Sequence, residues 1–79
     1  MGIEEKIIEL IRENVPDLPE EIKTTDSFLT DLGFDSLEIY QVIAVVEDEF
    51  RCVISDEALE TFQTLQDLID FVETAVEKG

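Results

Sequence analysis

The chain has 79 residues, of which 44% are hydrophobic, and 21 acidic residues against 5 basic ones give a formal net charge of -16. A chain this short buries roughly 60% of the surface that its unfolded form exposes, which leaves no room for an enclosed active site of ordinary size. The negative field excludes nucleic acid as a partner and favours a basic protein surface, although the acids could simply keep the domain soluble. We therefore expect residues 1–79 to form one folded domain.

The chain lacks the features of a membrane-inserted or secreted protein. No apolar run approaches the roughly 20 residues that a membrane helix needs, and the first residues form an acidic amphipathic segment. Cys52 is the single cysteine and has no partner for an internal disulfide, which fits a reducing compartment. We predict a cytoplasmic monomer with no membrane insertion, in which Cys52 is a half-buried structural thiol.

The first predicted helix runs from Ile3 to Val15, where the proline at position 16 and Pro19 end it. Its apolar residues recur at helical spacing: Ile3, Ile7, Ile8, Leu10, Ile11 and Val15. A long loop from about Asp17 to Asp35 follows. Its apolar residues, Ile22, Phe28, Leu29 and Leu32, predict a loop that packs against the helices, and Gly33 marks the turn at its end.

Three more helices are expected. The second runs from Ser36 to about Phe50, with Asp35 as N-cap and Glu38 completing a capping box. Ser55 caps a short third helix whose inward residues are Leu59 and Phe62. Thr64 and Asp67 cap the last helix, which carries the apolar stripe Leu65, Leu68, Ile69, Val72, Ala75 and Val76. The fold class is all-α: a small four-helix bundle of three long helices and one short one, with a long loop after the first.

The second helix has two different faces. Helical spacing gathers Ile39, Val42, Ile43, Val46 and Phe50 on a core-facing stripe. The opposite face gathers Leu37, Tyr40, Gln41, Ala44, Glu47 and Asp48. Apolar groups among acids are typical of a docking surface, although single exposed apolar residues also occur without function.

Ser36 stands at the start of this helix, next to unpaired backbone N–H groups that favour an attached anion. The chain contains no histidine, so a Ser-His-Asp triad cannot be built from it. It also lacks a metal-ligand motif and a glycine-rich phosphate loop, so we predict that it is not an enzyme. Any chemistry at Ser36 must be performed on it by another protein.

The segment LGFDSL resembles the Leu-Gly-x-Asp-Ser-Leu motif of acyl carrier proteins. The resemblance covers essentially the whole chain, including DSLEIYQVIAVVEDEF and ISDEALETFQTLQDLIDFV. It implies that a phosphopantetheinyl transferase attaches 4′-phosphopantetheine from coenzyme A to Ser36. The thiol of that arm would carry acyl chains as thioesters between enzymes of fatty acid biosynthesis.

The same resemblance implies roles for other residues. Asp35, Leu37 and Glu38 would help the transferase to recognise the site. The second helix would dock acyl-transfer and chain-elongation enzymes with basic patches, with Glu47 and Asp48 as the acidic contacts. An acyl pocket is implied near Phe28, Leu32, Ile39, Ile43, Val46, Leu59, Phe62 and Leu68, with Phe71 at its margin.

Several residues depart from the fatty-acid carriers that the chain resembles. Gln41 stands where an acid is common and Ala44 where a larger apolar residue is common, and Tyr40 and Arg51 are unusual. A carrier dedicated to a polyketide or another specialised acyl pathway is therefore the alternative. An unmodified acidic interaction module is a further one. No specific metal site is predicted, because the acid clusters lack EF-hand spacing and would bind divalent cations only weakly.

Overall fold

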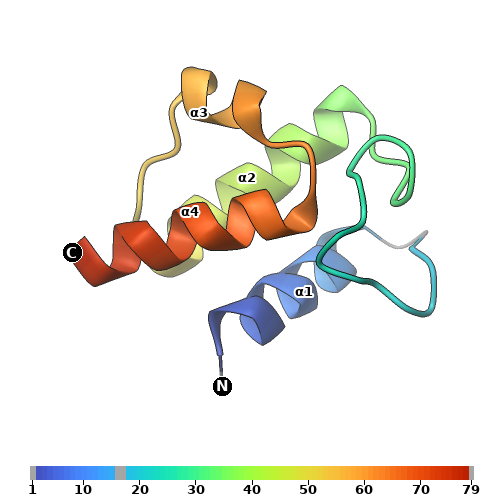
Figure 1. Cartoon of the computed structure of the whole chain (residues 1–79), viewed down its shortest axis with the longest axis horizontal. Coiled ribbons are helices and arrows are strands. Elements are labelled where there is room, and N and C mark those ends of the chain that lie inside the picture. The colour runs from blue at the N-terminus through green and yellow to red at the C-terminus, as the bar shows by residue number, and fades with distance from the viewer. Residues whose placement is uncertain (1, 16–17, 79) are drawn as a thin grey trace.

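The computed structural model describes residues 2–15 and 18–78. Within them the chain forms four helices, α1 (Ile3–Asn14), α2 (Ser36–Phe50), α3 (Asp56–Thr61) and α4 (Leu65–Lys78), as Figure 1 shows. The predicted all-α bundle of three long helices and one short one is confirmed, as is the long first loop. No helix in this part of the chain is both long and apolar enough to cross a bilayer.

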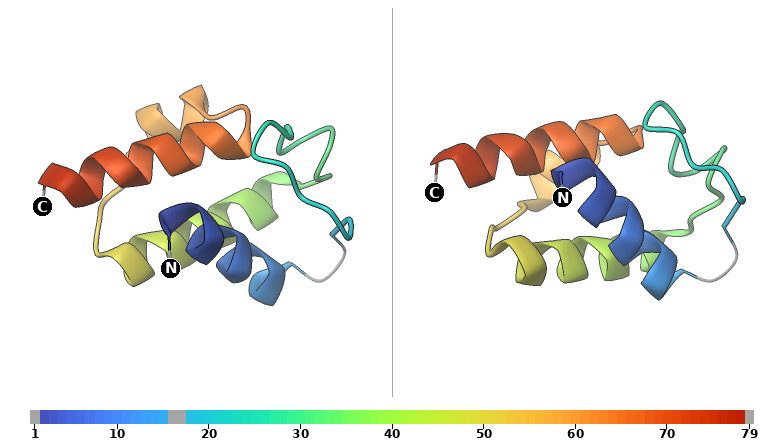
Figure 2. Two further views of the ribbon diagram at one scale, coloured as in Figure 1. Left: turned by 60° about the horizontal axis from the view of Figure 1, so that its bottom comes forward. Right: turned by 90° about the horizontal axis from the view of Figure 1, so that it is seen from below.

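The long loop lies at one end of the bundle. Helix α1 packs against both α2 and α4. Figures 1 and 2 show that α2 and α4 both begin at the end where the loop lies, and that α3 connects the far end of α2 back to the start of α4. The start of α2 therefore lies at the same end of the bundle as the loop.

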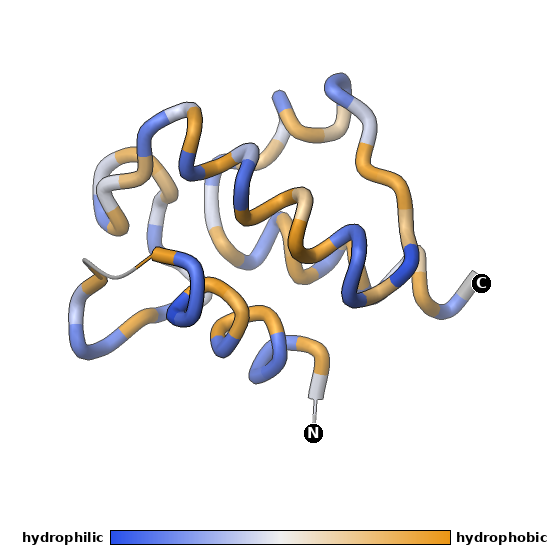
Figure 3. Tube along the Cα trace, turned by 180° about the vertical axis from the view of Figure 1, so that it is seen from behind, coloured by the Kyte–Doolittle hydropathy of each residue, from blue (hydrophilic) through white to orange (hydrophobic). Residues whose placement is uncertain are grey.

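One continuous apolar core joins the three long helices to the loop. The tube in Figure 3 alternates between hydrophobic and hydrophilic along α1 and α4, as expected of helices with one buried face. None of the described polar or charged side chains is buried. The core consists of Ile7, Leu10, Ile11, Val15, Phe28, Leu32, Phe34, Val42, Ile43, Val46, Ile54, Leu65, Leu68, Ile69 and Val72.

The predicted stripes agree with this core except at their margins. Ile39 and Phe50 are only partly buried on α2, and Val76 is 42% exposed near the end of α4. In the loop, Phe28 and Leu32 are buried as expected, but Leu29 is 65% exposed. Ile3 and Ile8 on α1 are likewise only partly buried, so each predicted stripe includes residues at the boundary of the core.

Helix α1 ends one residue before the predicted boundary. Val15 is its C-cap and donates its N–H to the carbonyl of Ile11 at 2.8 Å. The Arg12 guanidinium donates to the carbonyl oxygens of Pro19, at 3.4 Å, and Glu20, at 2.7 Å, so it ties the loop back onto the helix. The predicted breaker at position 16 and the predicted loop start at position 17 lie outside the described residues.

Backbone hydrogen bonds attach the loop to the start of α4. The N–H groups of Leu65 and Gln66 donate to the carbonyl oxygens of Asp26, at 3.1 Å, and Thr24, at 2.7 Å. Phe28 in turn donates to the carbonyl of Gln63 at 3.1 Å. The loop thus satisfies helix-terminal N–H groups that would otherwise lack a partner, which explains why it is packed down. Gly33 then turns the chain toward α2 with a φ of 70°, a conformation that favours glycine.

Asp67 and Thr64 complete the start of α4 as the sequence predicts. The Asp67 carboxylate accepts hydrogen bonds from the N–H groups of Gln63, at 2.9 Å, and Thr64, at 3.1 Å, while Asp67 donates its own N–H to the Thr64 hydroxyl at 3.3 Å. The bonds from the Gln63 and Thr64 backbone stabilise the ionised carboxylate, so they hold the pKa of Asp67 below its ordinary value.

This lowered pKa predicts how Asp67→Asn changes stability with pH. A depressed folded-state pKa means that Asp67 stabilises the fold fully above the ordinary aspartate pKa of about 3.9. The contribution is lost as the pH falls through the lower folded-state pKa. We expect Asp67→Asn to lower the melting temperature at neutral pH, with the difference from wild type shrinking on acidification. The control is Asp70→Asn, which removes the same charge from the same helix; an equal pH dependence in both variants would contradict the assignment.

Candidate functional site

A reciprocal capping box fixes the start of α2. Asp35 is extended, with φ −92° and ψ 177°, and its carboxylate accepts the N–H of Glu38 at 2.8 Å. The Glu38 carboxylate accepts the N–H of Asp35 at 3.2 Å. The predicted N-cap pair is therefore confirmed, and it places Ser36 at the first helical position with its side chain exposed.

The setting of Ser36 suits an anionic substituent. The capping box uses the N–H groups of Asp35 and Glu38, and within the described residues those of Ser36 and Leu37 have no internal acceptor. Free N–H groups at a helix start, together with the positive end of the helix dipole, stabilise a phosphate group. Ser36 thus combines an accessible hydroxyl with a site that would hold a phosphodiester.

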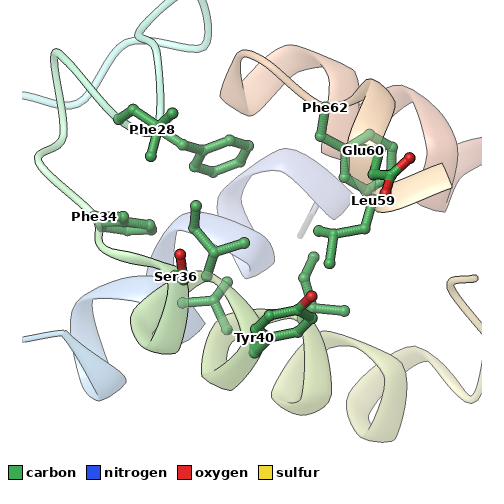
Figure 4. Close-up of a pocket in the computed structure, with 11 residues that line it drawn as sticks. Phe28, Phe34, Ser36, Tyr40, Leu59, Glu60 and Phe62 are labelled. Carbon is green, nitrogen blue, oxygen red and sulfur yellow. The ribbon is translucent and has the colours of Figure 1, made fainter. Parts of the chain in front are cut away.

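An apolar cavity of about 360 Å³ opens beside Ser36. Figure 4 shows Phe28 and Phe34 on one side of it and Leu59 and Phe62 on the other, with Ser36 and Tyr40 on α2 between them. The lining residues are Phe28, Leu29, Phe34, Ser36, Ile39, Tyr40, Val42, Ile43, Leu59, Glu60 and Phe62. The cavity therefore lies between the loop, α2 and α3.

Aromatic pairs support two of the cavity walls. Phe28 and Phe34 stack with ring centroids 5.7 Å apart, and Phe62 meets Phe71 edge to face at 5.6 Å. Helix α3 itself buries no residue, so it covers the cavity chiefly through Leu59 and the following Phe62. One wall of the cavity is consequently a short helix with little packing of its own.

The cavity takes in only part of the predicted acyl pocket. Five of the eight candidates line it: Phe28, Ile39, Ile43, Leu59 and Phe62. Leu32, Val46 and Leu68 are instead buried in the core, because neighbouring side chains fill the space around them. Phe71 supports Phe62 but does not line the cavity.

Sequence reasoning missed four lining residues, Leu29, Phe34, Val42 and Glu60, and assigned Tyr40 only to the docking face. Phe34 had a recognisable signal. It precedes the N-cap Asp35, and Ile39 is the fourth helical residue, which is the spacing of a hydrophobic staple. Both residues of the staple line the cavity, so the motif places a cavity wall next to the modification motif.

The outer face of α2, defined as Leu37, Tyr40, Gln41, Ala44 and Asp48, is exposed as the periodicity predicts. Leu37 is 79% exposed and Tyr40 55%. Glu47 differs from the expectation, because it is half-buried and its carboxylate accepts the N–H of Ile54 at 2.7 Å. Glu47 therefore uses one carboxylate oxygen to fasten the segment after α2, where Arg51 adopts a left-handed conformation with φ 54°.

Cys52 lies in the same segment and is half-buried, as predicted. Burial, together with the nearby Glu47 carboxylate, raises the pKa of its thiol above the ordinary value. A raised pKa keeps the thiol protonated at neutral pH and so makes it a poor nucleophile.

The residues around Ser36 fit a phosphopantetheine group. The hydroxyl is exposed, unpaired N–H groups stand beside it, and the mouth of an apolar cavity lies within the same turn of helix. Such an arrangement suits an attached phosphate on a flexible arm whose apolar cargo can be sheltered nearby.

Comparison with known proteins agrees with this geometry. A model of the phosphopantetheine attachment site family matches residues 5–72. The structure is similar to the crystal structure of an acyl carrier protein from Thermotoga maritima, with a TM-score of 0.82 and 31% identity over 94% of this chain and 86% of that one. It is also similar to a protein from Mycobacterium tuberculosis assigned as an acyl carrier protein, with a TM-score of 0.80 and 31% identity over 98% and 97% of the two chains.

Fold and site together define a small helical carrier domain for 4′-phosphopantetheine. The chain belongs to the acyl carrier proteins of the phosphopantetheine attachment site family. Domains of this family are generally not catalysts themselves, and they work by interacting with enzymes.

Proposed function

We propose that Ser36 is the residue that receives phosphopantetheine, from coenzyme A and through a separate phosphopantetheinyl transferase. The main support for this assignment is that an exposed serine hydroxyl, a capped helix start and the cavity mouth coincide at Ser36. The Ser36 oxygen would bond to the phosphorus that bears pantetheine, the bond from that phosphorus to the adenosine bisphosphate leaving group would break, and the hydroxyl proton would pass to a base of the transferase. The N–H groups of Ser36 and Leu37 would then face the new phosphodiester.

Asp35, Leu37 and Glu38 are proposed as the residues that the transferase recognises. Leu37 projects fully enough to enter a pocket on a partner. Asp35 and Glu38 each spend one carboxylate oxygen on the capping box, which leaves the other free for a basic side chain.

The arm, once bound, supplies a thiol on which acyl groups are held as thioesters. We propose that the domain carries such acyl groups between enzymes of fatty acid biosynthesis and shelters part of the chain in the cavity. A polyketide or other specialised pathway is the second candidate, favoured by Tyr40 at the cavity and by Gln41 and Ala44 on the outer face of α2.

The domain is further proposed to act as one monomeric unit over residues 1–79 in the cytoplasm. A single core connects α1, α2, α4 and the loop, which supports one cooperative unit. The half-buried, protonated Cys52 is consistent with a reducing compartment.

Docking to basic partners is assigned to the outer face of α2, and Asp48→Lys tests it. Asp48 is exposed, so the variant should fold normally, whereas Glu47→Lys would also break the bond to Ile54. We expect association with the transferase to slow by roughly two- to fivefold at low salt and to depend less on salt. Stopped-flow association rates across a salt series measure this.

The matched control is Glu73→Lys on α4, which changes the net charge equally from another exposed position. Equal slowing in both variants would show that the partner responds to total charge, and the assignment of the α2 face would then be wrong.

Incubation with coenzyme A and a transferase, followed by intact-mass measurement, tests the proposed modification. We expect one phosphopantetheine per chain. A chain that stays unmodified would favour the acidic interaction module instead.

A further inference from the structure

Tyr40 belongs to two surfaces at once. It is part of the outer face of α2, with 55% of its side chain exposed, and it also lines the cavity. Leu37, its neighbour on that face, is more exposed and does not line the cavity. Tyr40 is therefore the residue of the outer face at which the partner-facing surface and the apolar cavity meet.

The exposed lining residues define the mouth of the cavity: Leu29, Ser36, Tyr40 and Glu60. Four further lining residues are buried: Phe28, Phe34, Val42 and Ile43. Tyr40 carries the largest side chain at the mouth and stands one helical turn beyond Ser36, on the same side of α2. Figure 4 shows its ring between Ser36 and the α3 residue Leu59. An acyl chain that enters the cavity from Ser36 along α2 therefore lies beside this ring.

We propose that Tyr40 is a gate: its ring closes over an acyl chain in the cavity and sets how long the thioester-linked chain stays sheltered from solvent. The inference rests on the proposed attachment at Ser36. A half-exposed ring at the cavity mouth gains apolar contact when a chain lies beneath it, so the acyl chain itself favours closure. Because the same ring faces outward on α2, a docked partner contacts the gate directly.

The composition of the chain gives a direct probe of this gate. Tyr40 is the only tyrosine, and the chain has no tryptophan, so tyrosine fluorescence reports on the gate alone.

The volume of the cavity sets the length of the acyl chain to test. A methylene group occupies about the volume share of a liquid water molecule, roughly 30 Å³, so a cavity of about 360 Å³ has room for an eight-carbon chain. The octanoyl and acetyl forms of the pantetheine-bearing protein are therefore the pair to compare.

In the first measurement, acrylamide quenches the tyrosine fluorescence of both forms. We expect weaker quenching of the octanoyl form, because only the longer chain reaches beneath the ring and holds it closed. Equal quenching of the two forms would overturn the proposal that the Tyr40 ring closes over the chain.

In the second measurement, hydroxylamine cleaves the thioester of octanoyl and acetyl forms of three variants and of wild type. Tyr40→Ala should speed cleavage of the octanoyl form by roughly three- to tenfold, since loss of the ring shifts the population toward the exposed chain. Tyr40→Phe keeps the ring and should behave as wild type. Val53→Ala removes another exposed apolar side chain, 84% exposed and outside the cavity lining, and should also behave as wild type. The acetyl form should be cleaved at one rate in all four proteins.

These outcomes separate the gate from the proposed function. Equal octanoyl rates in wild type and Tyr40→Ala would overturn the gate. Equal octanoyl and acetyl rates in wild type would overturn both the gate and the sheltering role of the cavity, while carriage on Ser36 would stand. Failure to acquire phosphopantetheine, seen by mass before any acyl group is loaded, would overturn the proposed function itself.

Discussion

Ser36→Ala is expected to abolish the addition of phosphopantetheine to this chain completely, because the substitution removes the oxygen that would form the new phosphodiester. Ser36 is also the serine that stands at the first position of α2, beside the cavity. The overall fold should be unaffected, since the side chain is exposed and the capping box is made by Asp35 and Glu38. Intact-mass measurement after incubation with coenzyme A and transferase gives the answer.

Ser55→Ala is the matched control for this experiment. Ser55 is likewise exposed at a helix start, where its hydroxyl accepts the N–H of Ala58 at 3.1 Å. Its loss should cost about 1 kcal/mol of stability, as for other N-caps, but should leave the modification intact. An arm that still adds to Ser36→Ala, or fails to add to Ser55→Ala, would contradict the assignment.

Leu68→Ala is expected to lower the free energy of unfolding by about 2–5 kcal/mol, the usual cost of a large-to-small change in a filled core. Leu68 is fully buried on α4 and does not line the cavity. Small domains are stable by only about 5–15 kcal/mol in total, so the variant should unfold at a much lower temperature or urea concentration. Equilibrium urea unfolding followed by circular dichroism measures the change.

Leu59→Ala makes the same chemical change at a cavity-lining position and serves as the comparison. Its side chain is only half-buried and already borders open space, so its truncation removes fewer contacts and should cost clearly less. Similar losses of unfolding free energy in Leu68→Ala and Leu59→Ala would contradict the assignment of Leu68 to the core and Leu59 to the cavity lining.

The helices and their starts follow from local sequence. The capping residues Asp35, Ser55 and Thr64 each act on N–H groups within the next three residues, so short segments suffice to specify them. The periodicity of apolar residues likewise identifies the buried face of each helix, because a helix repeats over a few residues. The setting of Ser36 at a helix start could be predicted for the same reason.

Tertiary structure alone decided which inward-facing apolar residues line the cavity and which pack in the core. Periodicity shows that Val46 and Leu59 face inward, but it does not show whether neighbours fill the volume beside them. Val46 is fully buried in the core between the long helices. Leu59 belongs to the six-residue helix α3 and borders the cavity beside α2. The difference depends on residues distant in sequence, which a local pattern does not contain.

The roles of Glu47 and Tyr40 were decided in the same way. Both were predicted on the outer face of α2, but the turn after the helix brings the Ile54 N–H to Glu47, and α3 brings Leu59 toward Tyr40. Sequence by itself determined the helices, their caps and the position of the serine, because these depend on neighbours within a few residues. The folded chain determined that Glu47 fastens the following segment and that Tyr40 borders the cavity, because each contact requires a partner from another part of the chain.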